Sequence, residues 1–455
     1  MTVFDWVRSW FSSAPVAPPS PIPEPRSSEP AGEQSAERYS EPASSRPPQK
    51  KPPKSKQKPI ARRDRPRRVP VKLNRLRRLA HRTRQRLDDC TVPERPYAFA
   101  RPGVMGGYLD LSRDGRDDRL RQRGLPQFST PQELARWLQI PLVQLGWLVH
   151  RFQEQQRPAD LGSSHYYYQW LAKRTGGERL LEIPKRRLRD AQERILLEIL
   201  NRVPVHAAAH GFTVGRSIKT NAKPHVGQRV LLKFDLENFY PSVRFNRVVA
   251  IFRGLGYSRE AAIWLGRLTT TCIPVLTPDP ASPGRWLPYS IRHLPQGACT
   301  SPALANLSAY SLDLRLSGLA RKFNAHYTRY ADDITFSGDD VFRKSLAVFI
   351  PLVQQIIRHE QFVVNKKKRR VVRNNQRQSV TGVVVNEKAN VSRVAYDRLK
   401  ATLTNCVRLG PAAQNREAHA DFAAHLRGRV AHVTLLNRHR GEKLLALYMQ
   451  IDWSR

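Results

Sequence analysis

Cysteine is scarce in this sequence. The 455 residues include four cysteines, at positions Cys90, Cys272, Cys299 and Cys406. They lie far apart with no short C-x-x-C spacing, which argues against a disulfide framework and against a structural zinc knuckle. A reducing cytoplasm is therefore the expected compartment.

Long apolar runs are also lacking. No stretch approaches the ~18 apolar residues that a membrane-spanning helix needs. The first dozen residues carry Asp5 and Arg8, where a secretory signal peptide would have an uninterrupted apolar core. We therefore expect neither membrane insertion nor secretion, and no membrane as a partner.

Acidic residues are few relative to basic ones. The chain has 38 Asp and Glu against 78 Lys and Arg, a formal net charge of +40. This balance disfavours an enzyme that acts only on small neutral metabolites. It predicts a polyanionic partner, of which nucleic acid is the commonest.

The N-terminal region differs in composition from the rest. Residues 1–60 are predicted to be a disordered Pro-rich tail, because Pro15 to Pro59 contains almost no large apolar residue. Residues 61–127 are predicted to be a basic RNA-binding extension. Lys50 to Arg86 holds 17 Lys and Arg and one acid, Asp64, a composition that suits phosphate binding by counterion release. A solvated linker that only aids solubility is the alternative.

Globular patterning starts near Phe128. Ser129 or Thr130 can cap a helix that begins at Pro131, and helices then alternate with short apolar runs to about residue 386. One such run, Val230 to Phe234, predicts a buried strand. The last part of the chain is mostly helical in its periodicity, so the fold class is α+β.

Three acids follow or interrupt strand-like runs. Asp235 ends the run from Val230, while Asp332 and Asp333 separate two β-rich runs and so predict a hairpin with acids at its tip. Carboxylates brought together repel unless a cation lies between them. Two Mg²⁺ ions held ~3.5 to 4 Å apart would suit in-line phosphoryl transfer. Spacing alone leaves a solvated turn as the alternative.

Three segments resemble the palm of a reverse transcriptase, in the order typical of that family. They are FDLENFYPSV, LPQGACTSPALANL and YADD. Two further blocks are similar to those of bacterial retron reverse transcriptases: Asn221-Ala222 followed by His225, and Val380-Thr381-Gly382. The resemblance implies a right-hand polymerase with fingers at 128–232, a palm with an antiparallel sheet at 233–386 and a helical thumb at 387–455.

The resemblance also assigns roles to single residues. It implies that Asp235, Asp332 and Asp333 bind two Mg²⁺ ions, with the backbone carbonyl of Leu236 as a further ligand. Tyr240 falls where the family has an aromatic that excludes a ribose 2′-hydroxyl, with a plain core aromatic as the alternative. The remaining matches are Gln296 and Gly297 against the incoming nucleotide, Lys173, Arg174 and Arg179 of a fingers hairpin turning at Gly176-Gly177, Lys368 near the leaving pyrophosphate, and Asn221, His225, Val380, Thr381 and Gly382 as RNA-binding positions.

The implied activity is RNA-directed DNA synthesis. A retron enzyme copies part of a structured noncoding RNA into multicopy single-stranded DNA from an RNA 2′-hydroxyl, so the implied partners are that RNA, its cDNA, dNTP and an effector or toxin protein within an antiphage system. Another bacterial reverse transcriptase, of the group II intron or abortive-infection type, and a non-catalytic RNA-binding scaffold are the alternatives. After Ser301-Pro302 we expect a helix with Leu304, Leu307 and Leu314 facing inward.

Overall fold

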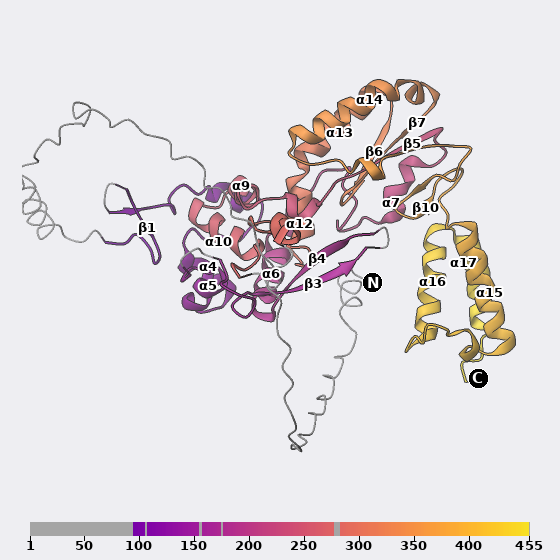
Figure 1. Ribbon diagram of the computed structural model, residues 1–455, viewed down its shortest axis with the longest axis horizontal. Coiled ribbons are helices and arrows are strands. Elements are labelled where there is room, and N and C mark those ends of the chain that lie inside the picture. Colours follow the sequence, from indigo (N-terminus) through magenta and orange to yellow (C-terminus); the bar gives the residue numbers. More distant parts are fainter. Residues whose placement is uncertain (1–93, 105–106, 154–156, 174–175, 277–282, 455) are drawn as a thin grey trace, which may run out of the picture. The chain divides into compact units, whose positions relative to one another are not determined.

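The computed structural model describes residues 94–104, 107–153, 157–173, 176–276 and 283–454 (Figure 1). They belong to one compact unit, which begins at Glu94. The predicted tail, 1–60, and residues 61–93 of the predicted extension lie outside the described residues. Residues 94–127 are folded into the unit, because Leu120 and Leu125 are buried in its main core. The extension predicted to reach residue 127 was therefore drawn too long.

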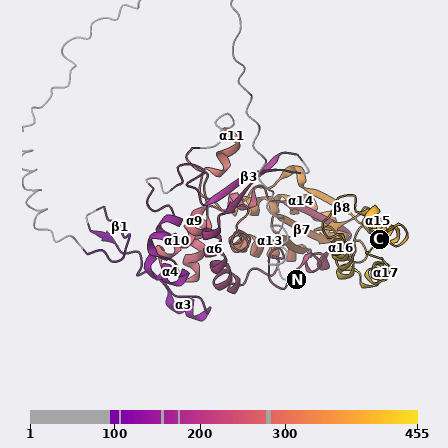
Figure 2. The ribbon, with the colours of Figure 1, turned by 90° about the horizontal axis from the view of Figure 1, so that it is seen from below.

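A helical head precedes the sheet. Its first elements are strands β1 (Arg101–Pro102) and β2 (Tyr108–Leu109), followed by α3 (Asp117–Gln122), α4 (Pro131–Leu138) and α5 (Leu142–Leu148). Helix α4 begins as predicted: the Glu133 N–H donates to the Thr130 hydroxyl at 3.3 Å, and the Glu133 carboxylate accepts from the Thr130 N–H. The head packs with α6 (Arg186–Glu198), α9 (Phe245–Leu255) and α10 (Arg259–Thr269), which lie beside it in Figure 2.

The fingers contain an antiparallel hairpin of β3 (Tyr166–Ala172) and β4 (Glu178–Pro184). Gly176 and Gly177 have φ values of 86° and 75°, so the turn needs the left-handed backbone that glycine adopts without strain. The predicted turn is confirmed. Short elements η1 (Leu200–Arg202), α7 (Ile218–Ala222) and η2 (Lys223–His225) lead from α6 to the palm.

The palm sheet has four antiparallel strands in the order β6-β7-β5-β8. They are β5 (Val230–Asp235), β6 (His326–Tyr330), β7 (Asp333–Gly338) and β8 (Arg370–Arg373). Strand β5 and the β6–β7 hairpin were both predicted. In the register, Asp235 pairs with Asp333 and Tyr330 pairs with Asp333 across the two ladders.

Alternation along the strands separates two faces of this sheet. Ile334 and Phe336 point into the main core, where α14 (Asp340–His359) supplies Phe342 and Phe349. The opposite face carries Asp235 and Asp333 near one end and contacts α7 and η2. The remaining connecting elements are α8 (Phe239–Ser242), α11 (Pro283–Trp286), η3 (Leu287–Tyr289), α12 (Ser301–Ser308), α13 (Tyr310–Lys322) and η4 (Lys366–Lys368).

The helix expected after Ser301-Pro302 forms, as α12, and α13 follows it directly. Leu304 is fully buried and Leu307 packs against the core. Leu314 is 54% exposed, so its predicted inward orientation is wrong. Its neighbour Asp313 is completely buried instead.

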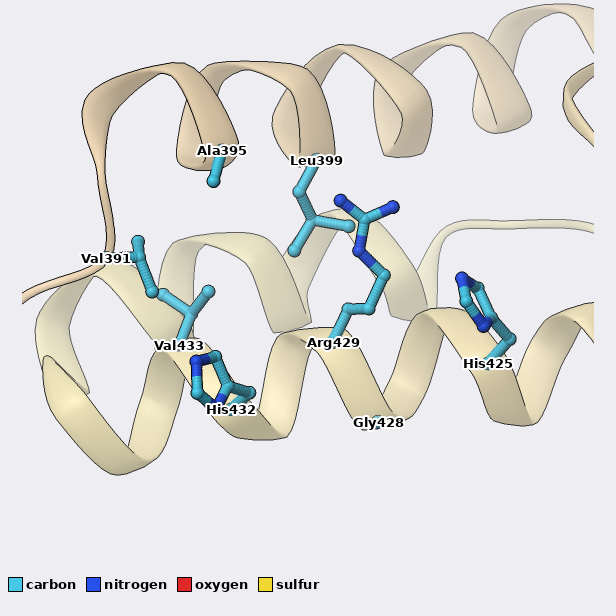
Figure 3. A pocket seen from close by; sticks show the side chains of 8 residues that line it. All are labelled: Val391, Ala395, Leu399, His425, Gly428, Arg429, His432 and Val433. Carbon is cyan, nitrogen blue, oxygen red and sulfur yellow. The ribbon is translucent and has the colours of Figure 1, made fainter. Parts of the chain in front are cut away.

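The thumb is a group of three helices, α15 (Arg393–Leu409), α16 (Phe422–Leu436) and α17 (Arg438–Met449), with η5 (Ala412–Gln414) between the first two. Leu399, Leu403 and Leu444 belong to a second core, which also includes residues of the small hairpin β9 (Ser379–Val380) and β10 (Val383–Val384). A pocket of about 280 Å³ opens between α15 and α16 (Figure 3). Its lining mixes basic and apolar side chains: Val391, Ala395, Leu399, His425, Gly428, Arg429, His432 and Val433.

None of the helices among the described residues has the length and apolar character needed to cross a bilayer.

Candidate active site

Three aspartates meet at one end of the palm sheet. Asp235 ends β5 and Asp333 begins β7, and these two are directly paired in the antiparallel register. Asp332 lies in the two-residue turn between β6 and β7, and its carbonyl accepts the Leu236 N–H at 3.0 Å. The turn that sequence patterning predicted thus brings all three carboxylates to the same place.

The electrostatics of this group are unfavourable without a cation. Burial, together with the charges of Asp333 and Asp235, raises the pKa of Asp332 to about 6. Burial also raises the pKa of Asp333, although Lys233 opposes this effect. Since these carboxyls hold their protons more tightly than usual, the site favours added positive charge.

Lys368 supplies part of that charge. Its Nζ lies 2.8 Å from Asp235 Oδ1, while the Lys368 side chain remains half exposed. The hydrogen bond to Asp235 raises the pKa of Lys368. Of the three adjacent lysines in η4, Lys368 is therefore the one for which the structure shows an ion pair with these aspartates.

The donor set fits a hard divalent cation. Within the described parts of the chain, no group of three or more His, Cys, Asp and Glu side chains forms a ready-made metal cage. Mg²⁺, however, usually takes one or two carboxylates and completes its shell with water and substrate phosphates. Three buried or half-buried carboxylates with a raised pKa at Asp332 meet that requirement.

Tyr240 lies beside the aspartates. It follows Phe239 in α8, which begins after Asn238 in a left-handed conformation with φ of 48°. The Tyr240 side chain is half-buried, and burial raises its pKa, with the Asp332 charge adding to the effect. Tyr240 therefore contacts the main core and is also within electrostatic reach of Asp332.

Gln296 and Gly297 lie against the fingers hairpin. The Glu182 N–H of β4 donates to the Gln296 carbonyl at 2.9 Å. Gly297 has φ of 144°, and a Cβ there would lie 2.8 Å from the Glu182 carbonyl oxygen, so only glycine fits. Behind this contact, buried His293 Nε2 and Glu182 Oε2 are 3.0 Å apart.

The basic residues of the fingers lie at the hairpin end. Lys173 is exposed beside the turn, and its N–H donates to the Gly177 carbonyl at 2.9 Å. Arg179 is half-buried on β4. Arg174 lies outside the described residues. The structure joins this hairpin to the Gln296 loop through β4 but gives no direct contact from Lys173 or Arg179 to the three aspartates.

The two retron-like blocks dock against each other inside the protein. His225 is completely buried, with Nδ1 2.7 Å from the Ser337 hydroxyl and Nε2 2.8 Å from the Thr328 hydroxyl. Asn221 is 2% exposed, and its Nδ2 lies 3.4 Å from the Thr381 hydroxyl. The predicted direct RNA contact is therefore corrected for Asn221 and His225, whose polar atoms face other parts of the protein.

The second block forms a turn at the base of the thumb. Val380 is buried in β9, Thr381 has φ of 46° and Gly382 has φ of 83°. Val380 cannot contact RNA directly from the thumb core, whereas Gly382 is exposed.

His225, in the first block, is a neutral link within the palm. Burial lowers the pKa of His225 to about 3, so its ring is neutral and serves as a hydrogen-bonding link between β6 and β7.

Sequence reasoning missed one buried group next to the site, Arg329 with Asp313. Both side chains are completely buried, and Arg329 Nη2 lies 2.6 Å from Asp313 Oδ2. Arg329 is three residues before Asp332. The available signal was an arginine placed at a core-facing position of the predicted strand, where an unpaired charge would be costly.

Sequence comparison places these residues in a known family. Residues 171–385 match the family described as "Reverse transcriptase (RNA-dependent DNA polymerase)". Retron Mx65 reverse transcriptase of Myxococcus xanthus is 41% identical over 332 residues, which cover 71% of this chain and 72% of that protein.

Two further relatives agree. Retron Mx162 reverse transcriptase of the same organism is 34% identical, covering 74% of this chain and 70% of that protein. Retron Ec86 reverse transcriptase of Escherichia coli is 30% identical, covering 63% of this chain and 80% of that protein. The fold is that of a right-hand polymerase, the activity is RNA-directed DNA polymerisation, and the chain belongs to the retron reverse transcriptases.

Proposed function

We propose that this enzyme copies a structured noncoding RNA into multicopy single-stranded DNA, starting from an RNA 2′-hydroxyl, and that Asp235, Asp332 and Asp333 form its active site. The observation that carries the proposal is the meeting of these three carboxylates with Lys368 at the end of β5 and β7. A non-catalytic scaffold would have no need for three carboxylates placed together so that the pKa values of Asp332 and Asp333 are raised.

In this proposal the aspartates hold two Mg²⁺ ions, with the Leu236 carbonyl as a further ligand. When bound, the ions would neutralise charge on the attacking and leaving oxygens of the nucleotidyl transfer. Because the pKa of Asp332 is raised to about 6, a nearby positive charge would favour its ionised form, which couples cation binding to ionisation of the site.

The protein's other residues orient and select the nucleotide. Tyr240 would press against the sugar and exclude a 2′-hydroxyl, and Gln296 with Gly297 would lie under the base pair. Lys173 and Arg179 of the fingers hairpin would meet the triphosphate. Lys368 would move from Asp235 to the leaving pyrophosphate, where it can donate a proton or neutralise charge.

The thumb would grip the RNA partner. The pocket between α15 and α16 places Arg429 and His432 beside apolar side chains (Figure 3). The rings of His419 and His425 stack nearby with centroids 3.9 Å apart. Cationic groups beside flat rings suit folded RNA, which is recognised by backbone contacts and by stacking of unpaired bases.

We also propose a protein partner for this chain. A retron enzyme that acts in the cytoplasm within an antiphage system would pair with an effector or toxin protein.

Sequencing the nucleic acid that copurifies with the full-length protein tests the proposal. We expect one abundant structured RNA joined through an internal guanosine 2′-oxygen to a short cDNA, and the same RNA without cDNA on the Asp332→Asn/Asp333→Asn variant. Copurification of an intron RNA, or of random cellular RNA, would contradict the retron assignment. Wild-type amounts of cDNA on the double variant would remove the aspartates from the active site.

A further inference from the structure

We propose that Arg329 is a positioning residue for polymerisation: its guanidinium, held by Asp313 and Asn306, fixes the turn that presents Asp332 to the nucleotide. This inference rests on the proposed assignment of Asp332 to the active site. Neither the sequence motifs nor the family comparison gives Arg329 a role.

The guanidinium makes four short contacts inside the palm. Its Nε and Nη2 donate to the two carboxylate oxygens of Asp313 at 2.8 and 2.6 Å. Its Nη1 donates to Asn306 Oδ1 at 3.0 Å and to the Ala331 carbonyl at 3.0 Å. The Asp313 pair thus anchors the group on α13, and Nη1 is left to hold the backbone one residue before Asp332.

The held backbone has a conformation that needs support. Ala331 has φ of 54°, in the left-handed region that residues with a Cβ seldom adopt. Asp332 follows in the same two-residue turn, so rotation at Ala331 would swing its carboxylate. The bond from Arg329 to the Ala331 carbonyl opposes this rotation.

A second segment closes on the same turn from the other side. The Arg329 N–H donates to the Ala208 carbonyl at 2.8 Å, and the His210 N–H donates to the Arg329 carbonyl at 2.8 Å. A Cβ on Gly211 would lie 2.8 Å from the Ala331 nitrogen, so glycine permits the close approach. Asn306 Nδ2 donates to the Gly211 carbonyl at 2.8 Å, which links this segment to the guanidinium.

The network also extends toward the nucleotide side. The Arg329 guanidinium carbon lies 5.7 Å from the centroid of the Phe239 ring, and Phe239 precedes Tyr240. One buried cation therefore contacts both the turn that carries Asp332 and the helix that carries Tyr240. Displacing it would disturb the two groups together.

A positive charge alone would not hold the turn that carries Asp332. The contacts use three nitrogens of a planar fork, two for one carboxylate and one for two further oxygens. Lysine at this position would keep the positive charge but offers one nitrogen, so it can pair with Asp313 without reaching the Ala331 carbonyl. Arg329→Lys is therefore the informative conservative change.

An ion pair that only stabilises the fold can be distinguished from one that positions the turn by replacing the whole pair with apolar side chains. Buried ion pairs can often be replaced by apolar side chains of similar size without loss of stability. Tyr327 also donates to Asp313, at 2.6 Å, so it must be changed as well. The variant Arg329→Met/Asp313→Leu/Tyr327→Phe removes the pair together with that dependent hydroxyl.

The test uses the full chain with its copurified RNA. For the wild type, the Arg329→Lys variant and the apolar triple variant, thermal unfolding, the kcat and KM for dNTP, and Mn²⁺ affinity by electron paramagnetic resonance are measured. All rates are measured at temperatures below each protein's own unfolding midpoint and are divided by the fraction of that protein that is folded. Arg247→Met is the matched control, since Arg247 also donates to backbone carbonyls, those of Glu360 and Ser308, but not to the turn.

We expect kcat to fall about 100-fold in the Arg329→Lys and triple variants, as for a displacement of ~1 Å at a reacting centre. KM for dNTP should change less than about threefold, Mn²⁺ affinity should weaken, and Arg247→Met should lose stability only. Wild-type kcat in folded Arg329→Lys would overturn the proposal, as would recovery of kcat in the triple variant. The Asp332→Asn variant is assayed in parallel. If the active-site assignment itself is wrong, Asp332→Asn will stay active; if only the role of Arg329 is wrong, Asp332→Asn will be inactive while Arg329→Lys keeps the wild-type kcat.

Discussion

Asp332→Asn should stabilise the metal-free protein while abolishing synthesis. Burial and the neighbouring carboxylates raise the pKa of Asp332 from 3.8 to about 6. The difference corresponds to roughly 3 kcal/mol of unfavourable free energy once the carboxyl is ionised. Asparagine has nearly the same shape and carries no charge, so it removes this cost.

The pH dependence follows from the direction of the shift. Because the folded-state pKa is the higher one, the unfolded chain ionises first as pH rises, and the free energy of unfolding falls between about pH 4 and pH 6 before levelling off. That fall should be smaller by roughly 3 kcal/mol in the variant. At pH 8 we expect an unfolding midpoint about 6 °C above that of the wild type, at roughly 2 °C per kcal/mol.

Differential scanning calorimetry in a chelating buffer, from about pH 4 to pH 8, measures both effects. Adding Mg²⁺ should then raise the midpoint of the wild type but not of the variant, since a ligand stabilises only the state that binds it. Asp340→Asn is the control: Asp340 is exposed and paired with Arg343 at 2.8 Å, so its removal should not stabilise the protein. If Asp332→Asn melts below the wild type at pH 8 with an unchanged pH slope, the reasoning about this carboxyl is wrong.

Three further outcomes can be checked in primer-extension and binding assays. Tyr240→Ala should admit ribonucleotides, raising their use against dNTP at least about tenfold, and undiminished discrimination would leave Tyr240 with a packing role only. Lys368→Met should lower kcat about 100-fold with little change in RNA affinity; an unchanged rate would make Lys368 only a counter-charge to Asp235. His225→Ala removes two buried hydrogen bonds, so it should cost about 2 to 4 kcal/mol of stability, while the folded fraction binds RNA as the wild type does; selective loss of RNA affinity would restore the predicted RNA contact.

Predictions from local patterns were confirmed where the pattern itself sets the structure. The cap at Thr130, the turn at Gly176-Gly177 and strand β5 ending at Asp235 each depend on residues within a few positions of one another. The hairpin at Asp332 was predicted in the same way, from two β-rich runs that are separated by a short turn. The family resemblance then assigned metal binding to the three aspartates.

Predictions that needed distant contacts were incomplete or wrong. Leu314 was expected to face inward, but it is 54% exposed, and its neighbour Asp313 is completely buried. An isolated carboxylate is costly to bury, and Arg329, on a strand that follows the helix, supplies the partner charge for Asp313. Similarly, the Asn221 and His225 block resembles a surface motif until the structure shows Asn221 Nδ2 next to the Thr381 hydroxyl and the two His225 ring nitrogens next to the Thr328 and Ser337 hydroxyls.

The sequence by itself determined the class of this protein and most of its chemistry: few acids against many bases, three aspartates at strand ends, and motif blocks in the order of a reverse transcriptase. These depend on composition and short-range patterning, which the chain displays directly. The tertiary structure decided that Leu120 and Leu125 join the main core, that Asn221, His225 and Val380 of the retron-like blocks are buried, and that Arg329 pairs with Asp313 and donates to the Ala331 carbonyl. Such contacts join groups that lie up to 160 residues apart, so only packing can bring them together.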